Sequence, residues 1–351
     1  MFRLWCAAAA AALVLPACVI QSGDLAADGA ASAAEASEAR ATAARDALTD
    51  ELDAACSKEP GPSRRAQVCH RWRCEGRAGR AAARWTGDAP ACVAATPDAD
   101  AVARALRVLN LHRFLADLPP VRVEEAWASA AQACALVAHA NEKLSHTPPP
   151  SSRCWSEQAA LASSLGLVAN RSAPVSIGAF FEDPGNETTM VHRRWLLSDA
   201  LARVGVGTTD RYACVVVDGR GLGEETEPGL APGDAAADGS GDDAARPSPR
   251  GWAAWPPAGP VPLDVFAAER LDEMGWTVQS DDDDLDRATA TVRSSGRSLA
   301  VRVTHLTPLL GSRSAIRIVP DGWTTEPGRV YDVSVDGPRP IAFAIEPTDC
   351  E

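Results

Sequence analysis

The sequence predicts an α+β protein in which a mixed domain of helices and strands precedes a small β-sandwich. Between residues 96 and 218, apolar residues recur at helical spacing and are followed by short apolar runs. After a stretch at 219–250 that is rich in Gly, Pro, Asp and Ala, the pattern changes to short strands separated by turn residues. That spacing is typical of a β-sandwich.

The chain has 351 residues, which is enough for about two domains together with a signal segment and linkers. Residues 19–55 contain no aromatic side chain and cannot build a core, so we expect a polar stalk there, either helical or coil. The predicted parts are a signal peptide, the stalk, a Cys-rich segment, the mixed domain, a flexible linker and the β-sandwich, at residues 1–17, 18–55, 56–95, 96–218, 219–250 and 251–351.

Helix-start signals place the helices of the mixed domain. Thr96-Pro97-Asp98 combines an N-cap residue, a proline for the first helical position and an acid for the first turn. A second helix is expected to start near Val123. Ser156 can cap a third helix, and Asn186 a fourth, which would carry His192.

Strands are expected at 205–207 and 212–217 in the mixed domain. The run 214–217 is apolar on both faces, as in a strand covered on both sides. In the β-sandwich, the alternation of strand and turn residues predicts strands at 288–292, 299–304, 315–319, 330–335 and 341–345.

The N-terminus carries an export signal. Met1-Phe2-Arg3 precedes the unbroken apolar run Leu4–Leu15, which is too short to span a bilayer. The run ends in Leu15-Pro16-Ala17-Cys18, which resembles the lipobox of bacterial lipoproteins and implies a diacylglycerol on the Cys18 thiol. The alternative is an ordinary cleaved signal peptide, but no Ala-x-Ala site lies nearby. Because Val19 follows rather than Asp, resemblance to the sorting rule of Gram-negative lipoproteins implies an extracytoplasmic protein anchored in the outer membrane.

The ten cysteines become eight once Cys6 leaves with the signal peptide and Cys18 is lipidated. An even number in an exported protein favours disulfides, and the absence of any Cys-x-x-Cys pair makes a zinc site the weaker alternative. We expect Cys134 to pair with Cys154 and Cys214 with Cys350. The other four would pair among themselves in an order that the sequence leaves open: Cys56, Cys69, Cys74 and Cys92.

Several motifs of the mixed domain resemble, in order, those of the CAP superfamily of cysteine-rich secretory, antigen 5 and pathogenesis-related proteins. They are Asn110-x-x-Arg113, Asp117-Leu118-Pro119-Pro120-Val121, Ala130-Ala131-Gln132-x-Cys134-Ala135, Leu144-Ser145-His146, His192-Arg193-Arg194-Trp195-Leu196-Leu197 and Val204-Gly205-Val206-Gly207. The His-Arg-Arg-Trp form is most similar to bacterial CAP-domain lipoproteins. The resemblance implies an α-β-α sandwich.

The resemblance also implies a cleft with two histidines and two glutamates, which together can bind a divalent ion. Alignment on Asn110 puts Leu109 at the first histidine position, and His112 lies three residues on and faces a different direction. His192 matches the last histidine. No Gly-Glu-Asn occurs at 163–166, and the second glutamate cannot be placed, although residues 182–183 are acidic. We therefore expect no tight metal site and no cofactor.

The sequence offers three weak candidates for catalytic residues, and each has a simpler structural explanation. His192 is more simply a hydrogen-bonded helix residue, His146 a residue that caps a turn, and Glu157 an acid in the first turn of a helix. The net charge of −13 argues against nucleic-acid binding. The favoured hypothesis is a lipid-anchored, non-catalytic module that binds an envelope protein, a glycan or a lipid. The alternatives are a metal-dependent or His-assisted hydrolase, such as a protease using His192, and a purely structural spacer.

Overall fold

The computed structural model describes residues 54–79, 81–222 and 250–350. The predicted lipidation site Cys18, the signal peptide and nearly all of the stalk and linker lie outside these ranges. Residues Lys58–Glu351 form one compact unit. Within the described residues, we find no helix with the length and apolar character needed to cross a bilayer.

A four-stranded sheet forms the centre of the mixed domain, in the order β1-β3-β4-β2. The strands are β1 (Arg122–Val123), β3 (Arg203–Thr208), β4 (Ala213–Val216) and β2 (Gly166–Ala169). β1 runs parallel to β3, and the other neighbours are antiparallel. The strands expected at 205–207 and 212–217 are therefore the two central ones.

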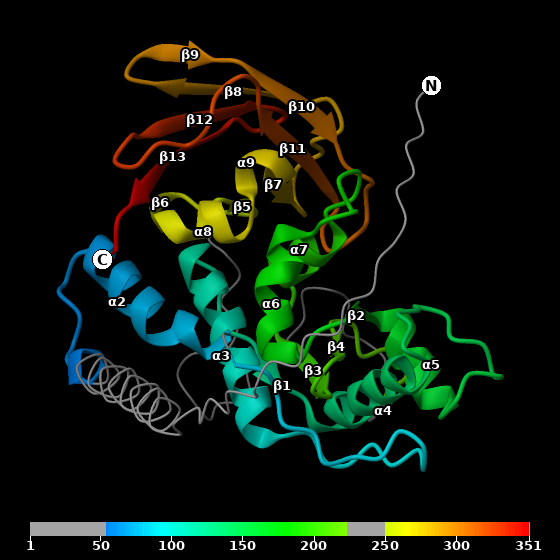
Figure 1. Cartoon of the computed structure of the whole chain (residues 1–351). Helices are drawn as coiled ribbons and strands as arrows, with labels where there is room; N and C mark the ends of the chain where they lie inside the picture. The colour runs from blue at the N-terminus through cyan, green and yellow to red at the C-terminus, as the bar shows by residue number, and fades with distance from the viewer. Residues whose placement is uncertain (1–53, 80, 223–249, 351) are drawn as a thin grey trace, which may run out of the picture. The chain divides into compact units, whose positions relative to one another are not determined.

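Helices cover both faces of this sheet (Figure 1). Cys214 and Val216 pack with α4 (Glu125–Asn141) and α5 (Glu157–Leu165). Ala213 and Val215, which alternate with them along β4, belong to a larger core that includes α3 (Ala99–Leu115) and α6 (Ala173–Glu182). Because successive strand residues point to opposite faces, this alternation produces three layers. The predicted α-β-α sandwich is confirmed.

Helix α4 lies unusually close to β3. A Cβ atom on Gly207 would come within 2.1 Å of the Ala131 backbone, so any side chain there would push the helix away from the sheet. The glycines of the Val204–Gly207 motif thus have a packing function.

Two helix-start predictions are wrong in detail. The side chain that caps α3 is Asp98, which accepts from the Asp100 N–H, and not Thr96. Helix α7 (Val191–Leu196) begins after Met190, and no side-chain cap from Asn186 is present. By contrast, Ser156 does cap α5 by accepting from the Ala159 N–H. Helix α6 was not anticipated, although Ser172 at its N-cap and Pro174 in its first turn are helix-start residues.

The C-terminal region contains two sheets, in the orders β10-β11-β7-β5 and β6-β13-β12-β8-β9. Five of these strands, which correspond to the predicted ones, are β8 (Thr289–Ser294), β10 (Val301–His305), β11 (Ser314–Pro320), β12 (Tyr331–Asp336) and β13 (Ile341–Thr348). The remaining elements are β5 (Trp252–Trp255), β6 (Gly259–Pro262), α8 (Leu263–Ala268), α9 (Leu271–Met274), β7 (Trp276–Ser280) and β9 (Arg297–Leu299).

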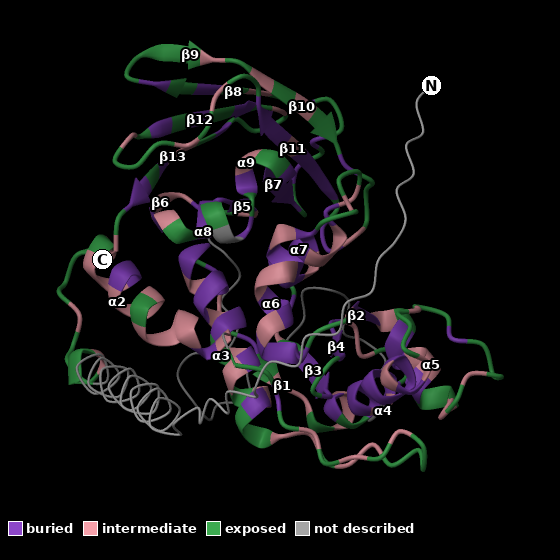
Figure 2. Ribbon diagram, in the orientation of Figure 1, coloured by how far each residue is buried: buried purple, intermediate pink, exposed green. Residues whose placement is uncertain are grey.

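The same hydrophobic core runs through the C-terminal region and the mixed domain. It joins Leu109 and Phe181 of the helices to Trp255 and Ile316 of the sheets. Figure 2 shows buried residues on both sides of this contact. The two regions therefore pack against each other as parts of one compact unit.

The predicted disulfide pairing is wrong. The structure instead joins Cys134 to Cys214, Cys92 to Cys154, and Cys69 to Cys350. Cys134 pairs with Cys214 because α4 packs directly on β4. Within the predicted Cys-rich segment, α2 (Arg64–Glu75) is followed by the 3-10 helix η1 (Gly76–Gly79). Helix α2 holds Cys69 next to the C-terminus, so the Cys-rich segment is not bonded only within itself. Cys56 and Cys74 are also disulfide-bonded.

Candidate functional site

The polar residues of the CAP-like motifs mainly hold the fold together. The Asn110 side chain donates to Val121 O at 3.0 Å and accepts from Val121 N at 2.8 Å, which fixes the loop after α3. Arg113 is fully buried, and its guanidinium donates to four carbonyl oxygens at 2.7–3.1 Å: Pro119, Leu196, Ser198 and Leu201. Burial lowers the pKa of Arg113 to about 10.

Gln132 has the same kind of function on the other face of the sheet. Its Oε1 accepts from Thr208 N at 2.8 Å, and its Nε2 donates to Thr208 O at 3.1 Å. A buried amide that satisfies both backbone groups of one residue fixes the end of β3 against α4. The polar side chains of Asn110, Arg113 and Gln132 therefore bind backbone groups of the fold and are not free to act on a ligand.

His192 lies at the start of α7 and is oriented by a buried carboxylate. Its Nδ1 is 2.8 Å from Oδ1 of Asp183, which has no exposed surface. Asp183 Oδ2 also accepts the backbone N–H groups of His192 and Arg193 at 3.0 and 3.3 Å. The His192 side chain is 17% exposed, and its Nε2 makes no hydrogen bond with the described residues. This arrangement leaves Nε2 available to act on a ligand or substrate.

The first histidine position of the family is closed. Leu109 is 1% exposed and belongs to the main core. His112, one turn later, is buried against the C-terminal region: its Nε2 is 2.7 Å from Glu269 Oε1, and its ring stacks on Phe181 and Trp255. Its Nδ1 donates to Val108 O at 2.8 Å, since a carbonyl oxygen can only accept.

Glu269 was not a candidate from the sequence. It lies 157 residues after His112, beyond the linker, and no local motif marks it. Its other oxygen accepts from Trp255 Nε1 at 2.6 Å, so the carboxyl group connects α3 to the C-terminal region.

The two arginines after His192 bind the C-terminal region as well. Arg193 donates to Gly275 O at 2.7 Å, and Arg194 donates to Thr307 O at 2.6 Å and Ser312 O at 3.0 Å. Burial lowers the pKa of both guanidinium groups to about 10. The helices that carry the two histidine positions of the family, α3 and α7, are thus both in contact with the C-terminal sheets (Figure 1).

The other sequence candidates lie apart from the Asp183–His192 dyad, the carboxylate–imidazole pair described above. His146 is exposed and its Nδ1 lies 2.9 Å from Ser163 O, and Glu157 is exposed in the first turn of α5. Of the polar candidates, hydrogen bonding joins only Asp183 and His192 within the described residues. In the same part of the chain, no group of three or more His, Cys, Asp or Glu residues is arranged to hold a metal ion.

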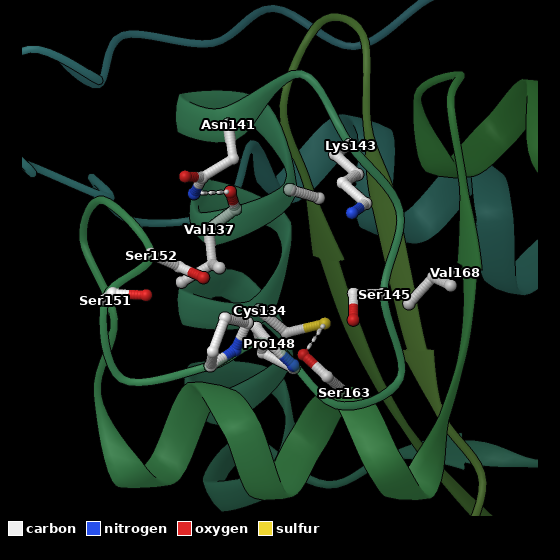
Figure 3. A pocket seen from close by; sticks show the side chains of 12 residues that line it. Cys134, Val137, Asn141, Lys143, Ser145, Pro148, Ser151, Ser152, Ser163 and Val168 are labelled. Atoms are coloured by element: carbon white, nitrogen blue, oxygen red, sulfur yellow. Dashed lines mark hydrogen bonds between the residues drawn. The ribbon is translucent and has the colours of Figure 1, made fainter.

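A pocket of about 300 Å³ opens beside the sheet, between α4, α5, β2 and the loop 143–152 (Figure 3). Its lining combines apolar residues with hydroxyl groups and one cation: Cys134, Val137, Ala138, Asn141, Lys143, Ser145, Pro148, Pro149, Ser151, Ser152, Ser163 and Val168. This volume lies at the lower end of the range for small-molecule sites, roughly 300–1,000 Å³.

His139 on α4 gives the fold a pH dependence. Its ring packs 4.5 Å from Trp85, and its Nε2 accepts from Arg211 at 3.3 Å, which requires the neutral imidazole. Burial lowers the pKa of His139 below its ordinary value of 6.5. Below pH 6.5 the unfolded chain therefore binds more protons than the folded one. The contribution of neutral His139 to the free energy of unfolding is therefore fully present above pH 6.5, and it is lost as the pH falls through the lowered pKa.

We expect His139→Phe to flatten the part of the stability profile between pH 7 and pH 5, because phenylalanine keeps the ring contact and does not titrate. Urea unfolding at intervals of pH measures this. The control is His70→Phe, because His70 is in a different helix, α2. An equal slope in wild type and His139→Phe would contradict the assignment.

Comparison with known proteins gives one family and one solved structure. The model of the CAP, or cysteine-rich secretory protein, family matches residues 106–216. A 1.5 Å crystal structure of an extracellular protein containing an SCP domain from Bacillus anthracis is similar at 16% identity and a TM-score of 0.26. The alignment covers 32% of this chain and only 38% of that one. No curated protein matches the sequence. Residues 106–216, with helices on both faces of a four-stranded sheet, are a domain of the CAP family.

Proposed function

We propose that the protein is a membrane-anchored, extracytoplasmic CAP-domain lipoprotein whose CAP domain is a non-catalytic binding or structural module. The observation that carries this proposal is that the protein's own C-terminal region contacts α3 and α7, the two helices that carry the histidine positions of the family. Leu109 is buried in the core, and His112 is held by Glu269. A cleft that has lost one imidazole and is packed against a neighbouring sheet is poorly suited to hold a divalent ion.

The cysteine chemistry supports a location outside the cytoplasm. Disulfides persist in oxidising compartments, and here they connect the sheet to α4 and α2 to the C-terminus. The acidic net charge of −13 argues against a nucleic acid as the partner, which leaves an envelope protein, a glycan or a lipid as the proposed classes.

We expect Cys18→Ser to release the protein from membranes. Acyl chains contribute about 0.8 kcal/mol per buried methylene, so removal of the modified thiol removes the anchor. Fractionation of cells into membrane and soluble material measures this, with Cys6→Ser as the control because Cys6 would leave with the signal peptide. Retention of Cys18→Ser in the membrane fraction would show another means of attachment.

A second candidate function is a His-assisted hydrolase, and the Asp183–His192 contact favours it. A buried carboxylate that orients one ring nitrogen and leaves the other free is the arrangement of a general base. Under the main proposal, we expect no ester or peptide hydrolysis that depends on His192.

Hydrolysis by wild type that is lost in His192→Ala would replace the main proposal with this second one. Calorimetry with zinc tests whether such a hydrolase would be metal-dependent. We expect no stoichiometric nanomolar site, and a site of that affinity that His192→Ala abolishes would show that other residues complete it.

A further inference from the structure

The pocket of Figure 3 has rigid walls. Cys134 on its lining is bonded to Cys214 of the central strand β4. The Asn141 side chain fixes the loop: it donates to Arg153 O and accepts from Arg153 N, both at 3.0 Å. Trp155 Nε1 donates to Pro148 O at 3.1 Å. A cavity held by these bonds exists before a ligand arrives, which lowers the entropic cost of binding.

The polar groups of the pocket that remain available to a ligand among the described residues are hydrogen-bond donors. The Lys143 ammonium makes no ion pair with any described residue, and its neighbour Glu142 binds Arg211 instead. Ser145 Oγ accepts from Thr147 N at 3.1 Å, so its O–H remains free to donate. The hydroxyls of Ser151 and Ser152 make no hydrogen bond with the rest of the described chain. Figure 3 shows Lys143 and Ser145 on one side of the cavity and the two serines on the other.

The remaining polar lining is already used. Asn141 Nδ2 donates to two carbonyl oxygens, and Ser163 Oγ donates to Ala159 O at 2.7 Å. The apolar part of the surface comes from Val137, Ala138 and Val168, beside the disulfide.

This chemistry selects one class of ligand. The lining contains no carboxylate, which excludes a cation, and no aromatic side chain on which a sugar ring could stack. A single ammonium group with hydroxyl donors matches one negative charge with oxygen acceptors. The small apolar surface matches a few methylene groups.

We propose that this pocket binds a small organic carboxylate with a short aliphatic body. Its carboxylate lies between Lys143 and Ser145, and its methylene groups lie on Val137, Ala138 and Val168. The inference rests on the proposed function, since it gives the binding module a ligand class, but its site is separate from the Asp183–His192 dyad.

The test is isothermal titration of the full chain with hexanoate, acetate, 1-hexanol and hexylammonium. We expect one hexanoate per chain, acetate and hexanol each weaker by about tenfold or more, and no hexylammonium binding. The chain contains only two lysines, and Lys58 is an exposed one, so Lys58→Gln is a matched control for Lys143→Gln. We expect Lys143→Gln to weaken hexanoate at least about tenfold and Lys58→Gln to leave it unchanged.

A second measurement locates the ligand. After ¹³C-methylation of the lysines, the Lys143 signal, identified by its loss in Lys143→Gln, shifts on addition of hexanoate and the Lys58 signal does not. Three results overturn the inference: no hexanoate binding, equal binding by Lys143→Gln, or equal affinity for acetate and hexanoate. His192-dependent hydrolysis would overturn the proposed function instead and leave hexanoate binding intact, so the two failures are distinguishable.

Discussion

Arg113→Met is expected to lower the free energy of unfolding by about 3–5 kcal/mol, because it leaves buried carbonyl oxygens without donors. The guanidinium holds together the loop after α3 and the segment after α7 through Pro119, Leu196, Ser198 and Leu201. Methionine has a similar length and no donor, so the loss reports the hydrogen bonds more than the packing.

Urea unfolding followed by circular dichroism measures the effect. Arg107→Met is the matched control, since Arg107 lies on the same helix and is exposed. A cost below about 1 kcal/mol for Arg113→Met would show that water replaces the guanidinium and that Arg113 does not hold these segments.

Glu269→Ala is expected to cost a comparable amount, about 3–5 kcal/mol, because it removes one member of a buried pair. His112 Nε2 and Trp255 Nε1 would both lose the carboxyl group that joins them, and His112 and Glu269 are each only 3% exposed. The contact between α3 and the C-terminal region would loosen. We therefore expect faster proteolysis of the folded protein as well as weaker resistance to urea.

Glu269→Gln is the control that separates charge from hydrogen bonding. An amide can donate to a neutral His112 Nε2 and accept from Trp255 Nε1, so every polar group keeps a neighbour. We expect a cost below about 1.5 kcal/mol. Equal losses for the alanine and glutamine variants would mean that the negative charge itself is required.

The local features of the fold were predictable from the sequence. Ser156 caps α5 as expected, the apolar run at 214–217 coincides with the central strand β4, and the alternating strands after residue 288 form sheets. These features depend on residues close together in the chain. Helix α6 and the short α8 and α9 were not found, because their amphipathic pattern is too brief to distinguish from an apolar loop.

The candidate site was predictable only in part. The sequence identified His192 and noted the acidic pair at 182–183, but the buried position of Asp183 and its contact with Nδ1 required the turn that brings them together. The sequence showed His112 three residues after the first histidine position, but Glu269 could not have been assigned to it, because nothing local links residues on either side of a long linker.

The sequence by itself determined the CAP-type motifs, the alternation that builds three layers, the acidic charge and the supply of cysteines, because each depends on residue type and short spacing. Only the tertiary structure decided which cysteines pair, which face of the CAP domain the C-terminal sheets cover, and that Lys143 stands over a pocket. The physical reason is that these contacts join segments far apart in the chain, and their partners are selected by packing of the whole core rather than by any local preference.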